Sequence, residues 1–470
     1  MTLAERRTFG ALGLAGAAVI AGLLLFAPTG LVAVVALPGA VAVALLAWGG
    51  LHGRTLAVLP LLFVAVFLID AIFRIRDYAD KDVDFQVFLK LAIWAAIAGI
   101  ALVHVRQWLG SFVTPTNIPS IMFLLWLMAT AAISASPAYS FVAAFSIVAW
   151  VLFSAYVFAN FDRVTVFATI VASIVVFCVV SIAVYFAIPE FGHYVYWLNE
   201  QRYISARLSG IAGSANNMGR IAAFGLILLG LYAREFRRLH WLFVPVSGVI
   251  MAAALAMTNS RTSLMMVVGI LSAVYVLKWR RLYLALFALG FALIAAALLL
   301  PFGNELGKLV ARSGNLDEIT SLTSRTDIWY AVFKLAEAQP WTGYGYGSSV
   351  FVLPQHEREV GFLTSHAHNL MLQLLLTTGW VGVALFSLSI VAVALRAAIR
   401  RDRDVLVLLC FVLFNGVTES SGFTTLANIC SLAFAIAVTL PPVRVTESVP
   451  VFGRTRRIDA HHRPYQRRFS

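Results

Sequence analysis

The sequence predicts an all-α membrane protein, a bundle of about 12–14 transmembrane helices with one large loop outside the membrane. The first observation behind this is composition, because 61% of the 470 residues are hydrophobic and only 12% are charged. The second is that apolar runs repeatedly reach the roughly 20 residues needed to cross a bilayer. A water-soluble domain of this length needs far more charge to cover its surface, so the globular classes are excluded.

Basic residues supply the third observation, because they gather in the short segments that fall on one side of a fourteen-span bundle. These residues are Arg6, Arg7, Arg54, Arg106, Arg163, Arg234, Arg237, Arg238, Lys278, Arg280, Arg281, Arg396, Arg400, Arg401, Arg403 and the arginines of the tail. The positive-inside rule makes this side and both termini cytoplasmic. The net charge of +13 then reflects topology and attraction to membrane lipids, and no nucleic-acid partner is expected.

These spans divide the chain into four parts. Residues 1–301 hold transmembrane helices 1 to 11, 302–365 form the large non-cytoplasmic loop, 366–440 hold the C-terminal transmembrane helices, and 441–470 are a basic cytoplasmic tail. The loop is too short for an independent core, so we expect it to pack on the bundle.

Inside the loop, the sequence SRTDIWYAVFKLAEAQP predicts an amphipathic helix that begins near Ser324. Ile328, Val332 and Leu335 share one face at helical spacing, and Pro340 ends the helix. The TGYGYGSS stretch that follows has three glycines at alternate positions, which permit tight turns or a close approach of the backbone to a ligand.

Three arginines are predicted on the non-cytoplasmic side, where positive charge is least expected. Arg207 precedes a span that begins near residue 216, Arg261 lies between two apolar runs, and Arg325 lies at the start of the loop helix. Snorkelling toward lipid headgroups would explain any one of them. Because guanidinium groups bind phosphate in a bidentate manner, all three together indicate an anionic ligand such as a diphosphate.

Two histidines lie where the next apolar run begins, in SHAHNLMLQLLLTTGW. We expect Thr364 or Ser365 to cap the helix, which places His366 and His368 in its first turn. There the helix macrodipole disfavours a proton on imidazole, and a neutral histidine suits a general base. The alternative is a histidine that only takes part in the hydrogen bonds of the helix end.

The same helix is expected to carry a polar stripe, because His366, Asn369 and Gln373 are spaced at i, i+3 and i+7. A metal site is not expected, since i, i+2 spacing on a helix would put the rings of His366 and His368 on different faces. No cofactor is expected either.

These segments resemble the O-antigen ligase and O-antigen polymerase superfamily. The resemblance rests on RLSGIAGSANNMGR, on TNSRTSL, and on SRTDIWYAVFKLAEAQPWTGYGYG followed by HNLMLQLLLTTGWVG, which occur in this order between about residues 200 and 400. Where many members have an acidic residue before Gly379, this chain has Thr377 and Thr378.

The resemblance implies a metal-independent, inverting glycosyltransferase with a GT-C-like bundle in the bacterial inner membrane. Its donor would be a glycan on undecaprenyl pyrophosphate, and its acceptor a lipid-linked glycan or lipid A-core at the periplasmic face. By position in the motifs, Arg207 and Arg261 would bind the pyrophosphate and His368 would be the catalytic base. The possible substrate-binding residues are Arg325, His366, Asn369, Asn217 and Glu419.

Three functions remain open at this point. The VTESSGF stretch is similar to the Thr-Glu-Ser element of exopolysaccharide polymerases of the ExoQ kind, which favours a polymerase over an O-antigen ligase. A transporter of polysaccharide or its lipid-linked precursor would instead need ionisable groups near the bilayer midplane. In the early spans only Asp70 lies well inside an apolar run, near its end, so the enzyme is favoured.

The charge pattern makes a prediction about topology. A reporter fused after Gly347 should be active only outside the cytoplasm, and a reporter fused after Arg401 only inside it, because the positive-inside rule fixes both segments together. Reporter fusions expressed in whole cells measure this directly. The reverse activities would place the predicted site on the wrong side of the membrane.

Overall fold

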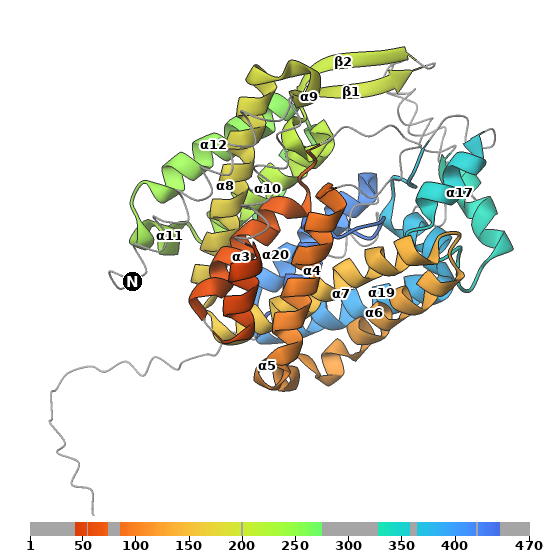
Figure 1. Cartoon of the computed structure of the whole chain (residues 1–470), viewed down its shortest axis with the longest axis horizontal. Coiled ribbons are helices and arrows are strands. Elements are labelled where there is room, and N and C mark those ends of the chain that lie inside the picture. The colour runs from red at the N-terminus through yellow and green to blue at the C-terminus, as the bar shows by residue number, and fades with distance from the viewer. Residues whose placement is uncertain are drawn as a thin grey trace, which may run out of the picture.

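The computed structural model describes residues 43–53, 55–73, 85–198, 201–274, 328–357, 364–419 and 422–441. Nearly all of the regular structure in these ranges is helical, and one two-stranded hairpin projects from the bundle (Figure 1). The predicted cap Ser324, the candidate Arg325 and the predicted spans before residue 43 lie outside the described residues.

The elements of the bundle follow the chain order. They are α3 Thr55–Ile69, α4 Phe85–Val103, α5 Val105–Phe112, α6 Ile118–Thr130, α7 Pro137–Asn160, α8 Arg163–Ala187, α9 Pro189–Gly192, β1 His193–Leu198, β2 Gln201–Leu208, α10 Ala215–Leu231, α11 Ala233–Leu239, α12 Phe243–Thr258, α13 Arg261–Ser272, α17 Ser349–Gln355, α19 Leu370–Arg400, α20 Arg403–Thr418 and α21 Ile429–Thr439.

Within the described residues, four helices are long and apolar enough to cross a membrane. They are Gln86–Val103, Pro137–Asn160, Arg163–Ala187 and Leu370–Arg400. A fifth span is added if α5 and Pro115–Ala131, which meet at 85°, are counted together. The predicted class, an all-α polytopic membrane protein, is confirmed, and the predicted total of 12–14 helices stays a prediction.

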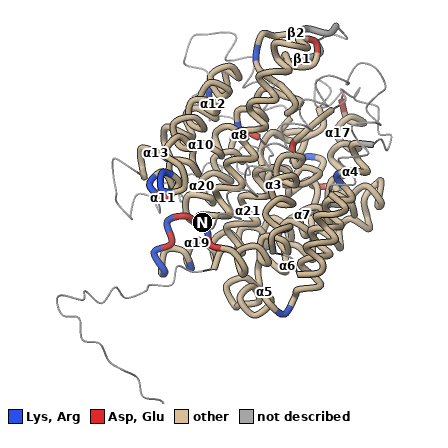
Figure 2. The backbone as a smooth tube through the Cα atoms, turned by 60° about the vertical axis from the view of Figure 1, so that its left-hand side comes forward, with Lys and Arg blue, Asp and Glu red and all other residues tan. Residues whose placement is uncertain are grey.

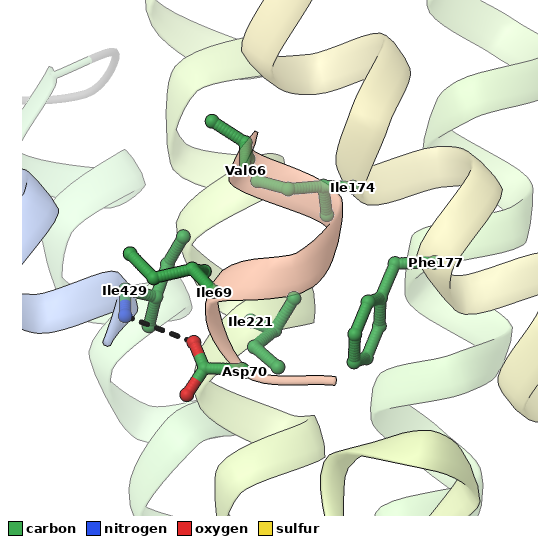
Figure 3. A pocket seen from close by; sticks show the side chains of 7 residues that line it. All are labelled: Val66, Ile69, Asp70, Ile174, Phe177, Ile221 and Ile429. Carbon is green, nitrogen blue, oxygen red and sulfur yellow. Dashed lines mark hydrogen bonds between the residues drawn. The ribbon is translucent and has the colours of Figure 1, made fainter. Parts of the chain in front are cut away.

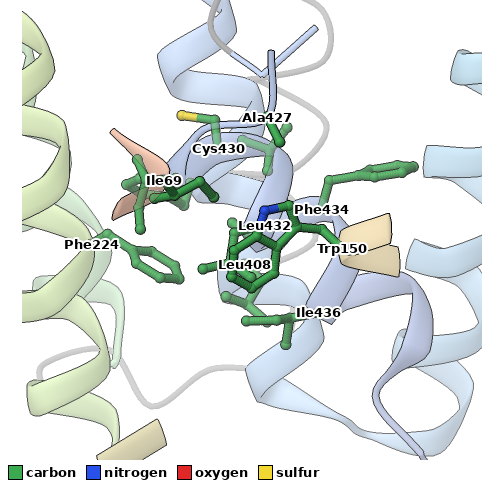
Figure 4. Packing of buried hydrophobic residues seen from close by; sticks show 14 of the residues in the cluster. Ile69, Trp150, Phe224, Leu408, Ala427, Cys430, Leu432, Phe434 and Ile436 are labelled. Atoms are coloured by element: carbon green, nitrogen blue, oxygen red, sulfur yellow. The ribbon is translucent and has the colours of Figure 1, made fainter. Parts of the chain in front are cut away.

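Helix α21 forms the centre of the bundle. All ten residues from Ile429 to Val438 are buried, as expected for a helix that is apolar on every side. It packs against α7 and α20, where Trp150, Leu408 and Phe434 contribute large side chains (Figure 4). In a membrane this packing is held by van der Waals contact and by polar groups between helices.

The hairpin of β1 and β2 is the part of the fold that the sequence analysis did not predict. Its strands pair antiparallel, with Val195 opposite Ile204 and a register irregularity between His193 and Tyr194. The segment is rich in aromatic and β-branched residues, which favour strands. The hairpin brings Arg207 to the end of β2 beside the first turn of α10.

The glycine-rich loop packs closely on α19. Gly343 and Gly379 both have positive φ, and a Cβ on Gly379 would lie 2.2 Å from the carbonyl carbon of Trp341. The backbones bond directly, with Tyr344 N donating to Leu376 O at 2.9 Å and Trp380 N donating to Pro340 O at 2.8 Å. The glycines therefore let the backbone approach α19 closely, and the approach to a ligand stays a prediction.

The loop helix is also confirmed over its described part, 328–338. Ile328, Val332 and Leu335, the predicted apolar face, are buried. Trp329 donates its indole N–H to the carbonyl of Ala367 at 2.9 Å. This contact connects the loop helix to the segment that carries both histidines.

An ionic cluster fixes the end of the bundle where the basic segments lie (Figure 2). The guanidinium of Arg163, at the start of α8, donates to both oxygens of Asp402 at 2.7 and 3.1 Å and to Asp404 at 3.0 Å. The hydroxyl of Tyr232, just beyond α10, donates to Asp404. Helices α8, α10 and α20 are therefore joined at one end, and their other ends lie on the opposite side of the bundle.

Replacement of Arg163 by alanine should destabilise the protein strongly. The carboxylates of Asp402 and Asp404 would stay largely buried without their countercharge, at a cost of about 3 to 5 kcal/mol. The matched control is Arg403→Ala, since that side chain is 47% exposed and should change stability by less than about 1 kcal/mol. Melting temperatures in detergent compare the two variants, and equal losses would contradict the structural role of the cluster.

Candidate functional site

The candidate site lies at the end of the bundle opposite the Arg163 cluster. Its centre is Glu419, the first residue after α20, in the break that leads to α21. The side chain of Glu419 is 13% exposed. Groups from β2, α10 and the segment before α19 converge on this carboxylate, so the site is assembled from parts of the chain up to about 200 residues apart.

Two histidines face one oxygen of the carboxylate. Glu419 Oε2 lies 3.7 Å from His366 Nε2 and 3.4 Å from His368 Nδ1. The imidazole rings lie side by side, with their centroids 4.0 Å apart. Burial raises the pKa of Glu419, but hydrogen bonds from His366 and His368 and the charges of His368 and Arg220 outweigh burial. The pKa therefore lies well below the ordinary value, and the carboxyl is ionised at neutral pH.

The other oxygen of Glu419 connects the histidines to Arg207. Asn216 Nδ2 donates to Glu419 Oε1 at 3.1 Å, and Arg207 Nη2 donates to Asn216 Oδ1 at 3.0 Å. Arg207 Nε also donates to the carbonyl of Thr258 at 2.9 Å, and its guanidinium lies 5.4 Å from the centroid of the Tyr194 ring. These contacts fix the plane of the guanidinium and join it through Asn216 to the carboxylate.

Arg261 begins α13, three residues after the Thr258 carbonyl that Arg207 contacts. Its side chain is exposed, in contrast to the half-buried Arg207. The first turn of α13 is held against α10 at Gly219, where a Cβ would lie 2.8 Å from Ser260 Cβ and 3.0 Å from Ser263 Oγ. This contact packs the Asn-x-x-Gly segment of α10 against the Ser-Arg-x-Ser segment of α13.

A second polar network lies beneath the site. Asn217 Nδ2 donates to Asp70 Oδ1 at 3.2 Å, and Arg220 Nη2 donates to Asn217 Oδ1 at 2.9 Å. The other oxygen of Asp70 accepts from the backbone N–H of Ile429 at 2.9 Å, among apolar side chains (Figure 3). These contacts fix the start of α21, and the substrate-binding role expected of Asn217 stays a prediction.

The predicted start of α19 is wrong. The N-cap is Asn369, whose Oδ1 accepts from the backbone N–H groups of Met371 and Leu372, so neither Thr364 nor Ser365 caps the helix. Both histidines therefore precede the helix. Asparagine is among the best N-cap residues, and here it caps the helix in place of the earlier hydroxyl residues.

This shorter helix overturns two further expectations. His366 is not part of a helical stripe with Asn369 and Gln373, because Gln373 accepts from Ala367 N and donates to Ser349. The two histidine rings are not on different faces, since His368 has a φ of 51° and turns the chain back on itself. Histidine tolerates this left-handed conformation better than most residues do.

The structure thus joins Arg207, His366, His368 and Glu419 in one network and places Arg261 on the neighbouring helix. Asn216 completes this network, and sequence reasoning missed it. Successive residues of a helix differ by about 100° in direction, so Asn216 reaches Glu419 whereas Asn217 reaches Asp70. The sequence contained the signal, two adjacent asparagines in the first turn of a span, but not the partner of each.

Fold and site together define a multi-pass membrane protein with arginines, histidines and a carboxylate gathered at one end of an apolar bundle. Comparison with known proteins shows what the chain is similar to. Residues 246–387 match the family model described as O-antigen ligase, a region that includes Arg261, His366 and His368. The resemblance to the O-antigen ligase superfamily is confirmed.

The chain is also similar to a curated protein. The general O-oligosaccharyltransferase of Acinetobacter baylyi (strain ATCC 33305 / BD413 / ADP1) is 25% identical over 210 residues, which cover 40% of this chain. The matched region spans 36% of the length of that relative.

Replacement of Gly219 by alanine should disturb the first turn of α13. The new methyl group would meet Ser260 and Ser263, and overpacking of this kind costs about 1 to 3 kcal/mol. Gly248→Ala in α12 is the control, because its Cβ meets only Leu229 Cδ2 at 3.5 Å and should stabilise the helix by up to about 1 kcal/mol. Thermal unfolding in detergent measures both. If Gly219→Ala is as stable as Gly248→Ala, the contact between α10 and α13 is not as tight as described.

Proposed function

We propose that this protein is an inner-membrane glycosyltransferase that transfers a glycan from an undecaprenyl-pyrophosphate donor to an acceptor sugar at the periplasmic face. The observation that carries the proposal is the network from Arg207 through Asn216 to Glu419 and the two histidines. It combines groups suited to a pyrophosphate with a histidine and a carboxylate suited to proton transfer. The confirmed superfamily supports glycan transfer as the chemistry.

Arg207 and Arg261 are suited to bind the pyrophosphate in different ways. Contacts to Thr258 and Asn216 hold the guanidinium of Arg207 in a fixed plane, so little side-chain entropy is lost when it binds. Arg261 is exposed at the N-terminus of α13, where backbone N–H groups and the macrodipole also favour an anion. Both charges would stabilise the negative charge that grows on the departing pyrophosphate.

His368 would act as the general base through Nε2. Its Nδ1 faces Glu419, so a proton on Nδ1 is favoured and Nε2 is left to accept one. The acceptor hydroxyl oxygen would attack the anomeric carbon, the bond from that carbon to the pyrophosphate oxygen would break, and the hydroxyl proton would pass to Nε2. Attack opposite the leaving group inverts the anomeric centre. Glu419 would stabilise the imidazolium that forms, and no metal is needed in this mechanism.

The acceptor distinguishes two functions within this chemistry. The VTESSGF stretch, which contains Glu419, favours a polymerase that extends one lipid-linked glycan with another. The O-antigen ligase match favours transfer to lipid A-core. Purified protein given only the lipid-linked donor should produce longer lipid-linked chains if it is a polymerase. If no product forms until lipid A-core is added, the protein is a ligase.

His368 and Arg261 should have separable kinetic roles. His368→Ala should lower turnover by about 10²-fold or more with little change in donor affinity, because a general base contributes about 10² to 10⁴. Arg261→Ala should weaken donor binding and slow turnover together, since the pyrophosphate charge is present in the bound donor and grows in the transition state. Steady-state kinetics with purified lipid-linked donor measure both parameters.

Two substitutions serve as controls for these roles. Arg261→Lys should restore only part of the activity, because a point charge does not replace a bidentate fork. His366→Ala should lose much less turnover than His368→Ala, although the two rings lie side by side. If His366 proves essential and His368 proves dispensable, the roles of the two histidines are the reverse of those proposed. If neither matters in folded protein, the general-base mechanism is wrong.

A further inference from the structure

His366, His368 and Glu419 present one ligand atom each to a common point. Their ligand atoms lie within 4.8 Å of one another, the one set of this kind in the part of the chain that the structure describes. Two imidazole nitrogens and one carboxylate oxygen are also the protein ligands of many zinc enzymes. The sequence analysis expected no metal site here because it placed both histidines on a helix, and the resemblance also implied a metal-independent enzyme.

Two of the three distances between these atoms are close to those of a zinc site. With metal–ligand bonds of about 2.0 to 2.1 Å, two ligands of a tetrahedral ion lie about 3.3 to 3.4 Å apart. The distances from Glu419 Oε2 are 3.4 Å to His368 Nδ1 and 3.7 Å to His366 Nε2. These two distances lie within a few tenths of an ångström of the tetrahedral value, and all three atoms lie within 4.8 Å of one another. The mixed imidazole and carboxylate set favours Zn²⁺ over Mg²⁺ or Ca²⁺, which prefer oxygen ligands alone.

The neighbours of the three ligands hold them in the required orientation. Asn216 donates to the other oxygen of Glu419 at 3.1 Å, and Ser365 Oγ lies 3.2 Å from His366 Nδ1, the ring nitrogen that would not bind the metal. The backbone between the histidines is fixed by Trp329 and Gln373, which bond to Ala367. Such outer partners orient the ligands of known metal sites.

We propose that His366, His368 and Glu419 bind one Zn²⁺ ion and that zinc bound there inhibits the enzyme. The inhibition rests on the proposed function, in which His368 Nε2 accepts the proton of the acceptor hydroxyl. Zinc on Nδ1 requires the neutral ring to carry its proton on Nε2, so this atom no longer accepts one. Zinc also takes the carboxylate of Glu419, which would otherwise stabilise the imidazolium. With zinc bound, the three residues form a metal site. Without zinc, His368 is the base and Glu419 stabilises its imidazolium.

Zinc binding is tested first, without reference to activity. The full chain is purified without a histidine tag, placed in lipid nanodiscs and titrated with Zn²⁺ in competition with a chromophoric chelator. We expect one ion per chain, and each of His366→Ala, His368→Ala and Glu419→Gln should weaken binding by at least about tenfold. His356→Ala is the matched control, a half-buried histidine of the same loop whose Nδ1 is bonded to the carbonyl of Val352 at 2.9 Å.

A second measurement keeps the test independent of variants that fold poorly. The visible absorption of Co²⁺ bound to the wild-type protein reports a tetrahedral site with imidazole ligands, and Zn²⁺ should displace the Co²⁺. A wild-type protein that binds neither ion, or binds them equally well after all three ligands are replaced, would overturn the zinc site. His368→Ala can still be inactive in that case, so the proposed function is unaffected.

The activity measurement follows in the same nanodiscs. Transfer from the lipid-linked donor should continue in excess chelator, stop when zinc occupies the site, and return when the chelator is added again. If zinc binds to the three residues and transfer continues, the inhibition is refuted, and so is the role of His368 as the general base. Loss of activity in chelator that zinc restores would also refute the inhibition and would make the metal part of the catalyst.

Discussion

The arrangement of the site depends on the burial of one charged carboxylate at the end of an apolar bundle. An ionised group in such a place is costly unless hydrogen bonds and opposite charge replace the lost water. Glu419 obtains them from Asn216 on one oxygen and from His366 and His368 on the other. Because Asn216 and the two histidines lie on two separate parts of the chain, the need to satisfy Glu419 brings both parts to the end of α20. Arg207 is held at the same place, since Asn216 donates to Glu419 and accepts from Arg207 at once.

The site also depends on contacts that contain no functional group. Gly343 and Gly379 let two backbones approach within hydrogen-bonding distance, which no residue with a Cβ allows at these positions. This contact sets where the glycine-rich loop lies on α19, and Trp329 transmits the position to Ala367 between the histidines. Packing of the loop therefore decides the direction of the imidazole rings, although the loop residues need not contact a substrate.

The sequence predicted the features that depend on local pattern. Apolar runs of about 20 residues and the distribution of arginines indicated the class of fold, and the motifs indicated Arg207, Arg261 and both histidines. The start of α19 was misplaced because three possible caps lie within six residues, and only the tertiary contacts of Ala367 and Gln373 decide among them. The pairing of Asn216 with Glu419 joins residues 203 positions apart, and no local pattern encodes such a contact. The hairpin was missed because its aromatic residues were counted only as part of a connecting segment.

Helices α10 and α20 each carry a polar group at both ends. The length of these helices therefore gives the distance between the ionic cluster and the site. Helix α20, Arg403–Thr418, begins beside Asp404 of the ionic cluster and ends just before Glu419, and its 16 residues span about 24 Å. The hydrocarbon core of a bilayer is about 30 Å thick. With the ionic cluster at one edge of the core, the carboxylate lies about one helical turn short of the other edge. Under the proposed function, the phosphates of a lipid-linked donor would bind at the level of the headgroups or just below, and the sugar would lie above them.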